Sequence, residues 1–247
     1  MIDLIIPITS KCPNLKQTLL SIMLQSIKDK LNIVLVTNKL NKHKSIIDLF
    51  LPKLNISILE SKDKKTIEEL KEYAISNTNN EYIMFLDENT YLYDAFSLST
   101  LYNQLLNDNS DFIIGNTVNL IDNNYYNTFS IYDNSNNKIY KRSYLNKNNI
   151  IFTNESLFTA TTYLYNRLYS YSDSITSVNI NTIELIDKKV IKNIISSIKE
   201  LSTNIDKNFI KEYINNIIRN TNDKYLNSNI KYNGILKELE KLYDEYN

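Results

Sequence analysis

The chain has 247 residues, enough for one large domain with an appendage, and it carries equal numbers of basic and acidic side chains, 28 of each. A balanced charge disfavours nucleic acid as the main partner, because binding to phosphates needs a basic surface. The single cysteine, Cys12, excludes an internal disulfide, and with the single histidine, His43, it excludes a zinc site built from His and Cys. Two glycines, Gly115 and Gly234, are too few for a Walker A loop or a GxGxxG fingerprint.

Strand-like and helix-like patterns alternate over the first ninety residues. Continuous apolar runs are typical of strands buried on both faces of a sheet, and apolar residues between these runs recur at helical spacing. Thr66 and Glu69 have the spacing of a capping box. We expect strands at 4–8, 33–36, 56–59 and 82–86, and helices at 13–25, 46–51 and from 66 onward. This alternation predicts a parallel, doubly wound α/β sheet, in which ligands bind beyond the carboxyl ends of the strands.

The pattern changes after Asp87. It predicts a helix at 96–106, a strand at 112–114, β-hairpins or a long excursion over 117–141, a helix at 156–169 and a strand at 175–180. From about Asp187, three apolar stripes at helical spacing predict an all-helical segment. We therefore divide the chain into an α/β domain, 1–184, and a helical C-terminal extension, 185–247. The extension either covers the core or contacts a protein partner.

Three polar residues, Asp87, Glu88 and Asn89, follow the predicted strand 82–86. A carboxylate just past a central strand lies where such a sheet presents ligands. Carboxylate and amide oxygens are also the ligands that Mg²⁺ and Mn²⁺ prefer. The alternative is that Asp87 caps the next helix, because Asp and Asn are common turn residues.

Several short strings occur in an order that is typical of one enzyme family. After the strand 4–8, residues 15–25 read L..TL.SI..Q, and 81–87 read EYIMFLD. Further along, 138–145 read KIYKRSYL and 149–152 read NIIF. Over about residues 2–180 the chain thereby resembles family 2 glycosyltransferases. The resemblance implies the GT-A fold, a Rossmann-like, mostly parallel sheet flanked by helices, here followed by the helical extension.

The same resemblance implies transfer of a sugar from a nucleotide-diphosphate sugar to a glycan, lipid-linked or protein acceptor, with Mn²⁺ or Mg²⁺ and an acidic general base. Donor and cofactor contacts are then expected at Pro7, Thr37, Asn38, Lys71, Asp87 and Glu88. The expected metal ligands are Asp87 and Asn89.

The chain departs from the family at four functional positions. The family has Asp-Asp after the second strand, Arg-Asn before the fourth, a second Asp in its D-x-D and Glu-Asp at the general base. Here these positions hold Thr37-Asn38, Lys71-Glu72, Asn89 and Thr161-Thr162. Thr cannot accept a proton at neutral pH. Two hypotheses follow: an active but atypical transferase, or a catalytically inactive GT-A-fold protein that serves as a binding or scaffolding subunit.

Glu155 and Asp173 are the remaining candidates for a general base. Glu155 is equally interpreted as a charge favoured at a helix N-terminus. We expect His43, in a Lys- and Asn-rich loop, to be solvated. The pair Lys141-Arg142 either meets a diphosphate or is an ordinary solvated pair.

No apolar run approaches the length that crosses a bilayer, and the first residues lack the basic lead of a signal peptide. We therefore expect a cytoplasmic protein, with the membrane surface as the alternative location.

Overall fold

The computed structural model describes residues 1–9, 12–121, 124–128, 135–164, 169–180, 188–202, 205–225 and 233–246. Its strands are β1 (Ile2–Ile8), β2 (Leu31–Thr37), β3 (Ile56–Glu60), β4 (Tyr82–Phe85), β5 (Thr90–Leu92), β6 (Phe112–Ile121), β7 (Asn124–Thr128), β8 (Lys138–Lys141) and β9 (Tyr169–Ile180). Its α-helices are α1 (Leu15–Met23), α2 (Lys44–Asp48), α3 (Ile67–Ser76), α4 (Ser97–Asn107), α5 (Arg142–Lys147), α6 (Glu155–Leu164), α7 (Lys188–Leu201), α8 (Lys207–Tyr225) and α9 (Asn233–Glu245). Two 3₁₀ turns, η1 (Lys28–Lys30) and η2 (Leu40–Lys42), flank β2.

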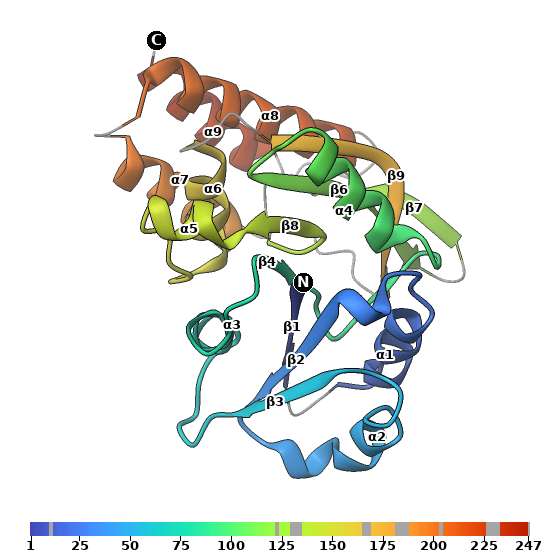
Figure 1. The fold of residues 1–247 in the computed structure, drawn as a ribbon. Helices are drawn as coiled ribbons and strands as arrows, with labels where there is room; N and C mark the ends of the chain where they lie inside the picture. Colours follow the sequence, from blue (N-terminus) through green and yellow to red (C-terminus); the bar gives the residue numbers. More distant parts are fainter. Residues whose placement is uncertain are drawn as a thin grey trace.

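The described strands join into one curled sheet in the order β3-β2-β1-β4-β8-β6-β9-β5, with β7 paired to β6 (Figure 1). β1 to β4 are parallel to one another. β8 then runs antiparallel to both β4 and β6, and β9 returns parallel to β6. The predicted α/β fold with helices flanking the sheet is thereby confirmed.

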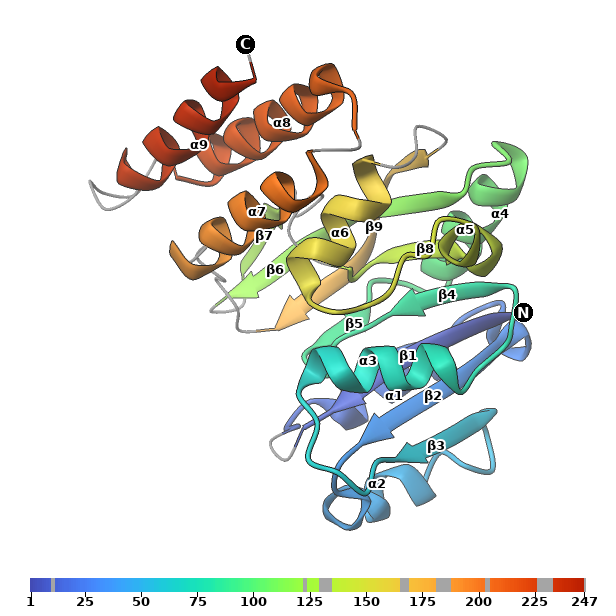
Figure 2. The same cartoon turned by 90° about the vertical axis from the view of Figure 1, so that its left-hand side faces the viewer.

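Helices cover both faces of the sheet, which explains the continuous apolar runs. In β1, Leu4 and Ile6 pack with α1, α2 and α4, whereas Ile5 points to the other face and packs with α3, α5 and α6. Figure 2 shows α3 lying over the face of β1 and β2. Because successive strand residues face opposite sides, a strand covered on both sides must be apolar at every position.

Pro7 marks where β1 and β4 part. The carbonyl of Ile5 accepts a hydrogen bond from the amide of Leu86 at 3.0 Å, so this side of β1 faces β4. Pro7, two residues on, faces the same neighbour but has no N–H to offer. The pairing therefore ends, and the chain after Leu86 leaves the sheet.

The helices α7, α8 and α9 form a separate hydrophobic cluster that includes Ala160 and Leu164 of α6. Figure 1 shows α8 and α9 at the end of the molecule away from β3. The predicted helical extension is thus present and shares its core with α6. The boundary at 184 falls outside the described residues and stays a prediction. Within the described ranges, no helix combines the length and apolarity needed to cross a bilayer.

Two parts of the sequence prediction were wrong. The helix expected to reach residue 169 ends at Leu164, and Tyr169 instead begins the long strand β9. Tyr, Ile, Thr and Val favour a half-buried pleated surface, and pairing with β6 decides the outcome. The short strand β5 was not expected at all. The predicted hairpin is confirmed for β6 and β7, whereas residues 129–134 lie outside the described part.

Candidate functional site

Asp87 stands at the carboxyl edge of the parallel strands, directly after Leu86. Its carbonyl accepts a hydrogen bond from the amide of Thr90 at 2.9 Å, which closes a tight turn. Asn136, which precedes β8, forms an isolated bridge with Phe85 and donates its side-chain amide to the Asp87 carboxylate. The Asp87 side chain is 41% exposed, so one part of it faces the open edge of the sheet. The sequence prediction of a carboxylate at this edge is therefore correct in position.

Lys71 is the buried cation beside Asp87. It lies in α3, which begins with the predicted capping box between Thr66 and Glu69. Its side chain is only 2% exposed, and its Nζ lies 2.8 Å from Oε2 of Glu155 and 3.8 Å from Oδ1 of Asp87. Three further contacts hold it: the hydroxyl of Ser135 at 3.1 Å and the rings of Phe85 and Phe152 at 5.3 and 5.1 Å.

Glu155 is the first residue of α6, and its carboxylate points to Lys71. The backbone amide of Ser135 donates to the other carboxylate oxygen. The segment 135–136 thus touches both acids, because Ser135 holds Glu155 and Asn136 holds Asp87. Asp87, Lys71 and Glu155 are hereafter called the triad.

Charge pairing in the triad shifts the pKa of its members. Burial alone would lower the pKa of Lys71, but Glu155 and Asp87 outweigh it, so this pKa lies above its ordinary value of 10.5. Burial alone would raise the pKa of Glu155, but the ammonium of Lys71 and the Ser135 donors outweigh it and bring this pKa below 4.5. Desolvation raises the pKa of Asp87, and the nearby Glu155 adds to this because one ammonium is shared by two carboxylates. Lys71 and Glu155 are therefore both charged at neutral pH.

Glu88 turns away from the triad and ties two loops together. Both of its carboxylate oxygens accept hydrogen bonds from Thr9, one from the backbone amide and one from the hydroxyl, each at 2.8 Å. The carbonyl of Thr9 in turn accepts from Nε2 of His43 at 2.8 Å. His43 is 6% exposed, so the expectation that it is solvated was wrong. This hydrogen bond holds Thr9, the residue that follows β1, in place.

The side chain of Asn89, a predicted metal ligand, is engaged by Asn14. Its Oδ1 accepts a hydrogen bond from the side-chain amide of Asn14 at 3.0 Å, which binds it to the start of α1. Asp87 instead faces Asn136 and Lys71. In the described part of the chain, no three His, Cys, Asp or Glu side chains converge as metal ligands. This donor set does not fit the Mn²⁺ or Mg²⁺ that the family resemblance implies.

A pocket of about 460 Å³ opens at the carboxyl ends of β1, β2 and β3. Its apolar lining comes from Ile8, Ile67 and Leu70, and its charged lining from Lys39, Lys62, Asp63, Lys64 and Lys65. Thr9, Thr37, Asn38 and Thr66 complete it. Two links join the pocket to the triad: Leu70 precedes Lys71 in α3, and Thr9 holds Glu88, the neighbour of Asp87. The pocket is basic, since four lysines face one aspartate.

The predicted donor-contact residues Thr37 and Asn38 do line this pocket, but their side chains hold the backbone. Thr37 donates its hydroxyl to the carbonyl of Ile8 at 3.0 Å. The side-chain amide of Asn38 donates to the carbonyl of Lys65 at 2.7 Å, and its oxygen accepts from the amide of Lys65 at 3.0 Å. They therefore shape the pocket wall. Pro7 is buried within β1 and does not line the pocket.

The structure also places the candidates for a general base. Thr162 is fully buried in α6, and the hydroxyl of Thr161 donates to the carbonyl of Leu157 at 2.6 Å. Glu155 is ion-paired, which makes it a weaker base than a free carboxylate. Asp173 belongs to β9, and its side chain lies outside what the structure describes.

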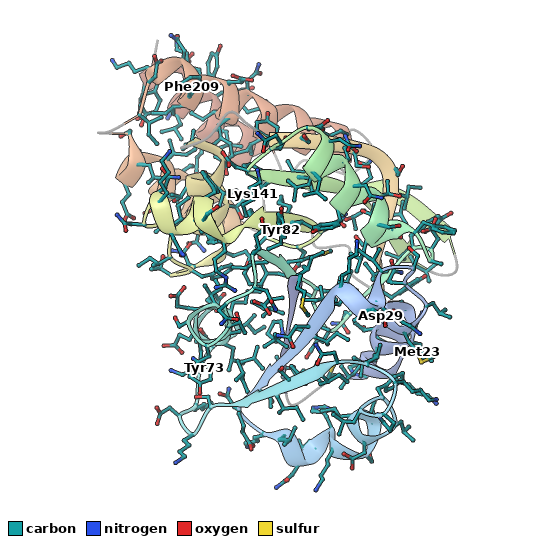
Figure 3. The ribbon with its side chains drawn as sticks, viewed as in Figure 1. Met23, Asp29, Tyr73, Tyr82, Lys141 and Phe209 are labelled. Atoms are coloured by element: carbon teal, nitrogen blue, oxygen red, sulfur yellow. The ribbon has the colours of Figure 1, made fainter. Side chains whose placement is uncertain are left out.

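Arg142 is not an ordinary solvated residue, because it pairs with a buried carboxylate, whereas the hydrogen bonds of Lys141 are exposed to solvent. Lys141 pairs with Tyr82, the first residue of β4, so it lies at the amino edge of the parallel strands (Figure 3). Its Nζ binds the carbonyl and side-chain oxygens of Asn109. Arg142 forms an ion pair of 2.8 Å with the buried Asp3. From Tyr82 to Phe85 the strand rises about 10 Å, so this edge is well removed from Asp87.

Sequence reasoning missed Ser135, Asn136 and the lysines of the β3–α3 loop. The segment 62–65, which reads KDKK and immediately precedes the capping box, is a readable signal, because basic residues ahead of a helix N-terminus favour an anion there. Ser135 and Asn136 carry no such signal. The bridge between Asn136 and Phe85 of β4 brings them to the triad.

No protein-family model matches the chain, and a comparison with curated proteins finds no match. Solved structures do resemble it. TarS residues 1–349 from S. aureus superpose with a TM-score of 0.72 at 17% identity, covering 99% of this chain and 80% of that one. The complex of the same TarS fragment with UDP-GlcNAc gives 0.70 at 17% identity, covering 99% and 81%.

A more distant likeness is to the mannosyltransferase PcManGT from Pyrobaculum calidifontis in complex with GDP-Man and Mn²⁺. Its TM-score is 0.62 at 11% identity, with 99% of this chain and 81% of that chain covered. A longer TarS structure is covered over 49% of its length. At these identities the likeness shows the fold, which is that of GT-A-like proteins.

Proposed function

We propose that this chain is a glycosyltransferase that binds a nucleotide-diphosphate sugar in the lysine-lined pocket and transfers the sugar to a glycan, lipid-linked or protein acceptor. The observation that carries the proposal is the place of the pocket. It lies at the carboxyl ends of β1 to β3, where α/β sheets bind ligands, and its lining residue Thr9 contacts Glu88, the neighbour of Asp87. The two solved neighbours named by their ligands bind UDP-GlcNAc and GDP-Man, which supports this donor class.

The chemistry of the pocket suits such a donor. Ile8 and Leu70 offer an apolar wall for a base, and Lys62, Lys64 and Lys65 supply positive charge for a diphosphate. The dipole of α3 favours an anion at its N-terminus, where the capping box uses the amide of Glu69 and the first turn also carries the acidic Glu68 and Glu69. Asp87 does not line the pocket, but its neighbour Glu88 holds the lining residue Thr9, and Asp87 is the proposed anchor of the sugar end of the donor.

The second candidate is a GT-A-fold protein that binds a donor but does not transfer the sugar. The pairing of Glu155 with Lys71 favours it, because this pairing engages the one candidate base whose side chain is described. Thr161 and Thr162, at the positions where the resembling family has Glu-Asp, favour it too. Binding of a protein partner by α7, α8 and α9 belongs to this second candidate and remains a prediction.

Nucleotide binding is the first test. Calorimetric titration with UDP and with GDP is performed on the wild type, on Lys62→Glu/Lys64→Glu and on Lys28→Glu. Lys28 is an exposed lysine at the amino edge of β2, and its variant controls for a charge reversal away from the pocket. We expect the double variant to weaken the better nucleotide by about tenfold or more, since two charges beside a diphosphate are reversed. Lys28→Glu should stay within about twofold of the wild type.

Release of free nucleotide from the matching nucleotide-sugar then separates the two candidates. Steady release in the presence of acceptor supports the transferase. Binding without release supports the second candidate. Failure of both UDP and GDP to bind at millimolar concentration refutes the donor pocket itself.

A further inference from the structure

The position beside Asp87 already holds a cation. The Nζ of Lys71 lies 3.8 Å from Asp87 and 2.8 Å from Glu155, and Lys71 is 2% exposed. It cannot leave without stranding two carboxylates, and the rings of Phe85 and Phe152 enclose it. A lysine held in this way is a permanent part of the site.

The other oxygens of the segment 87–89 are directed elsewhere. Asn136 donates to the Asp87 carboxylate, Thr9 engages both oxygens of Glu88, and Asn14 engages Asn89. A divalent ion prefers several oxygen ligands around one point. Here three side chains in a row face three different partners, so a metal bound at Asp87 would compete with the Lys71 ammonium for the same carboxylate.

We propose that Lys71 takes the place of a divalent metal in this chain, so that nucleotide-sugar binding is independent of metal ions. This inference rests on the proposed function for its donor, but not for its statement about the cation. Lys71 is then a positioning residue, which fixes Asp87 and Glu155 and neutralises one of their two charges. The charge of the diphosphate is balanced by Lys62, Lys64 and Lys65 at the pocket and by the N-terminus of α3.

Binding of Mn²⁺ to the protein without nucleotide tests the cation directly. The paramagnetic resonance signal of free Mn²⁺ is followed as wild type, Lys71→Ala, Lys71→Arg and Lys71→Ala/Asp87→Ala are added. We expect the wild type and Lys71→Arg, which keep the charge, to leave the signal unchanged at about 1 mM Mn²⁺. Lys71→Ala leaves the carboxylates of Asp87 and Glu155 facing the space that the ammonium had filled, and this variant should bind one Mn²⁺ per chain. The added Asp87→Ala should abolish that binding.

Nucleotide affinity is the second measurement. The Kd of the wild type for UDP or GDP in EDTA should equal that in Mn²⁺ within about twofold. A rise in affinity of tenfold or more with Mn²⁺ overturns the inference. Stoichiometric Mn²⁺ binding by the wild type that is lost in Asp87→Ala also overturns it. A folded Lys71→Ala variant that binds no Mn²⁺ overturns it as well.

The two proposals fail separately. If no nucleotide binds with or without metal, the donor function falls while the Mn²⁺ measurements still decide the role of Lys71. The wild-type measurement needs no variant, so it decides even when Lys71→Ala does not fold.

Discussion

Replacing Arg142 by methionine should cost the fold about 3–5 kcal/mol of unfolding free energy, the range for breaking a buried ion pair from one side. The guanidinium lies 2.8 Å from the carboxylate of Asp3, which is 0% exposed. It also donates to the carbonyls of Asn80 and Ile75 at 2.7 and 2.9 Å and to the hydroxyl of Thr78 at 2.9 Å. Methionine fills similar volume but leaves Asp3 as a charge without its cation.

The remaining partners of Asp3 set the size of the loss. Asn32 and Asn80 still donate three hydrogen bonds to its carboxylate, at 2.7, 3.0 and 2.7 Å. These hydrogen bonds reduce the loss of unfolding free energy, but they do not replace the positive charge of the guanidinium. Arg142→Lys keeps the charge but cannot reach all four acceptors, so its loss should be smaller.

Unfolding of the wild type, Arg142→Met and Arg142→Lys in guanidinium chloride measures the losses of unfolding free energy. Titration with nucleotide under native conditions measures the nucleotide affinity of each protein. We expect the affinity of folded Arg142→Met to equal that of the wild type, because Arg142 lies at the opposite edge of the sheet from the pocket. A loss of stability below about 1 kcal/mol refutes the structural role. A tenfold loss of affinity would instead restore the interpretation of Arg142 as a diphosphate contact.

Three further predictions concern the triad, β6 and α3. Because the folded pKa of Glu155 lies below its ordinary 4.5, its stabilising contribution is complete above pH 4.5 and is lost as the pH falls through the folded value. Glu155→Gln should therefore lose less stability than the wild type from about pH 5 to about pH 3 in denaturant titrations, and an equal loss contradicts this. Gly115→Ala would place a Cβ in collision with Oγ1 of the buried Thr176, so we expect about 1–3 kcal/mol of destabilisation, and an unchanged melting temperature counts against it. Thr66→Ala removes one half of the capping box and should cost about 0.5–2 kcal/mol by the same unfolding assay, whereas no loss would mean that the cap is not formed in solution.

The first half of the fold could be predicted because its signals are local. A strand covered on both faces is apolar at every position, and the run 4–8 shows this directly. The capping box at Thr66 likewise needs only four consecutive residues. The strand predicted at 175–180 is the second half of β9, but the first half, 169–174, could not be recognised in the same way, because it becomes a strand through pairing with β6, more than fifty residues earlier in the chain.

In the candidate site, too, local patterns could be predicted and long-range contacts could not. Asp87 was found because a carboxylate after a buried strand is a local pattern. Its partnership with Lys71 and Glu155 was not, since these come from α3 and α6 and meet only through the folded sheet. His43 shows the opposite error: its polar sequence neighbours suggested solvent, whereas its contact with Thr9 buries it.

The most direct test of a metal-independent donor site beside Asp87 is a crystal structure grown with the better-binding nucleotide and MnCl₂, with anomalous data collected for manganese. We expect the nucleotide between Thr37 and Lys65, the Nζ of Lys71 still between Asp87 and Glu155, and no anomalous peak at Asp87. A nucleotide bound elsewhere contradicts the proposed pocket. A manganese peak at Asp87 with Lys71 displaced contradicts the proposed role of Lys71.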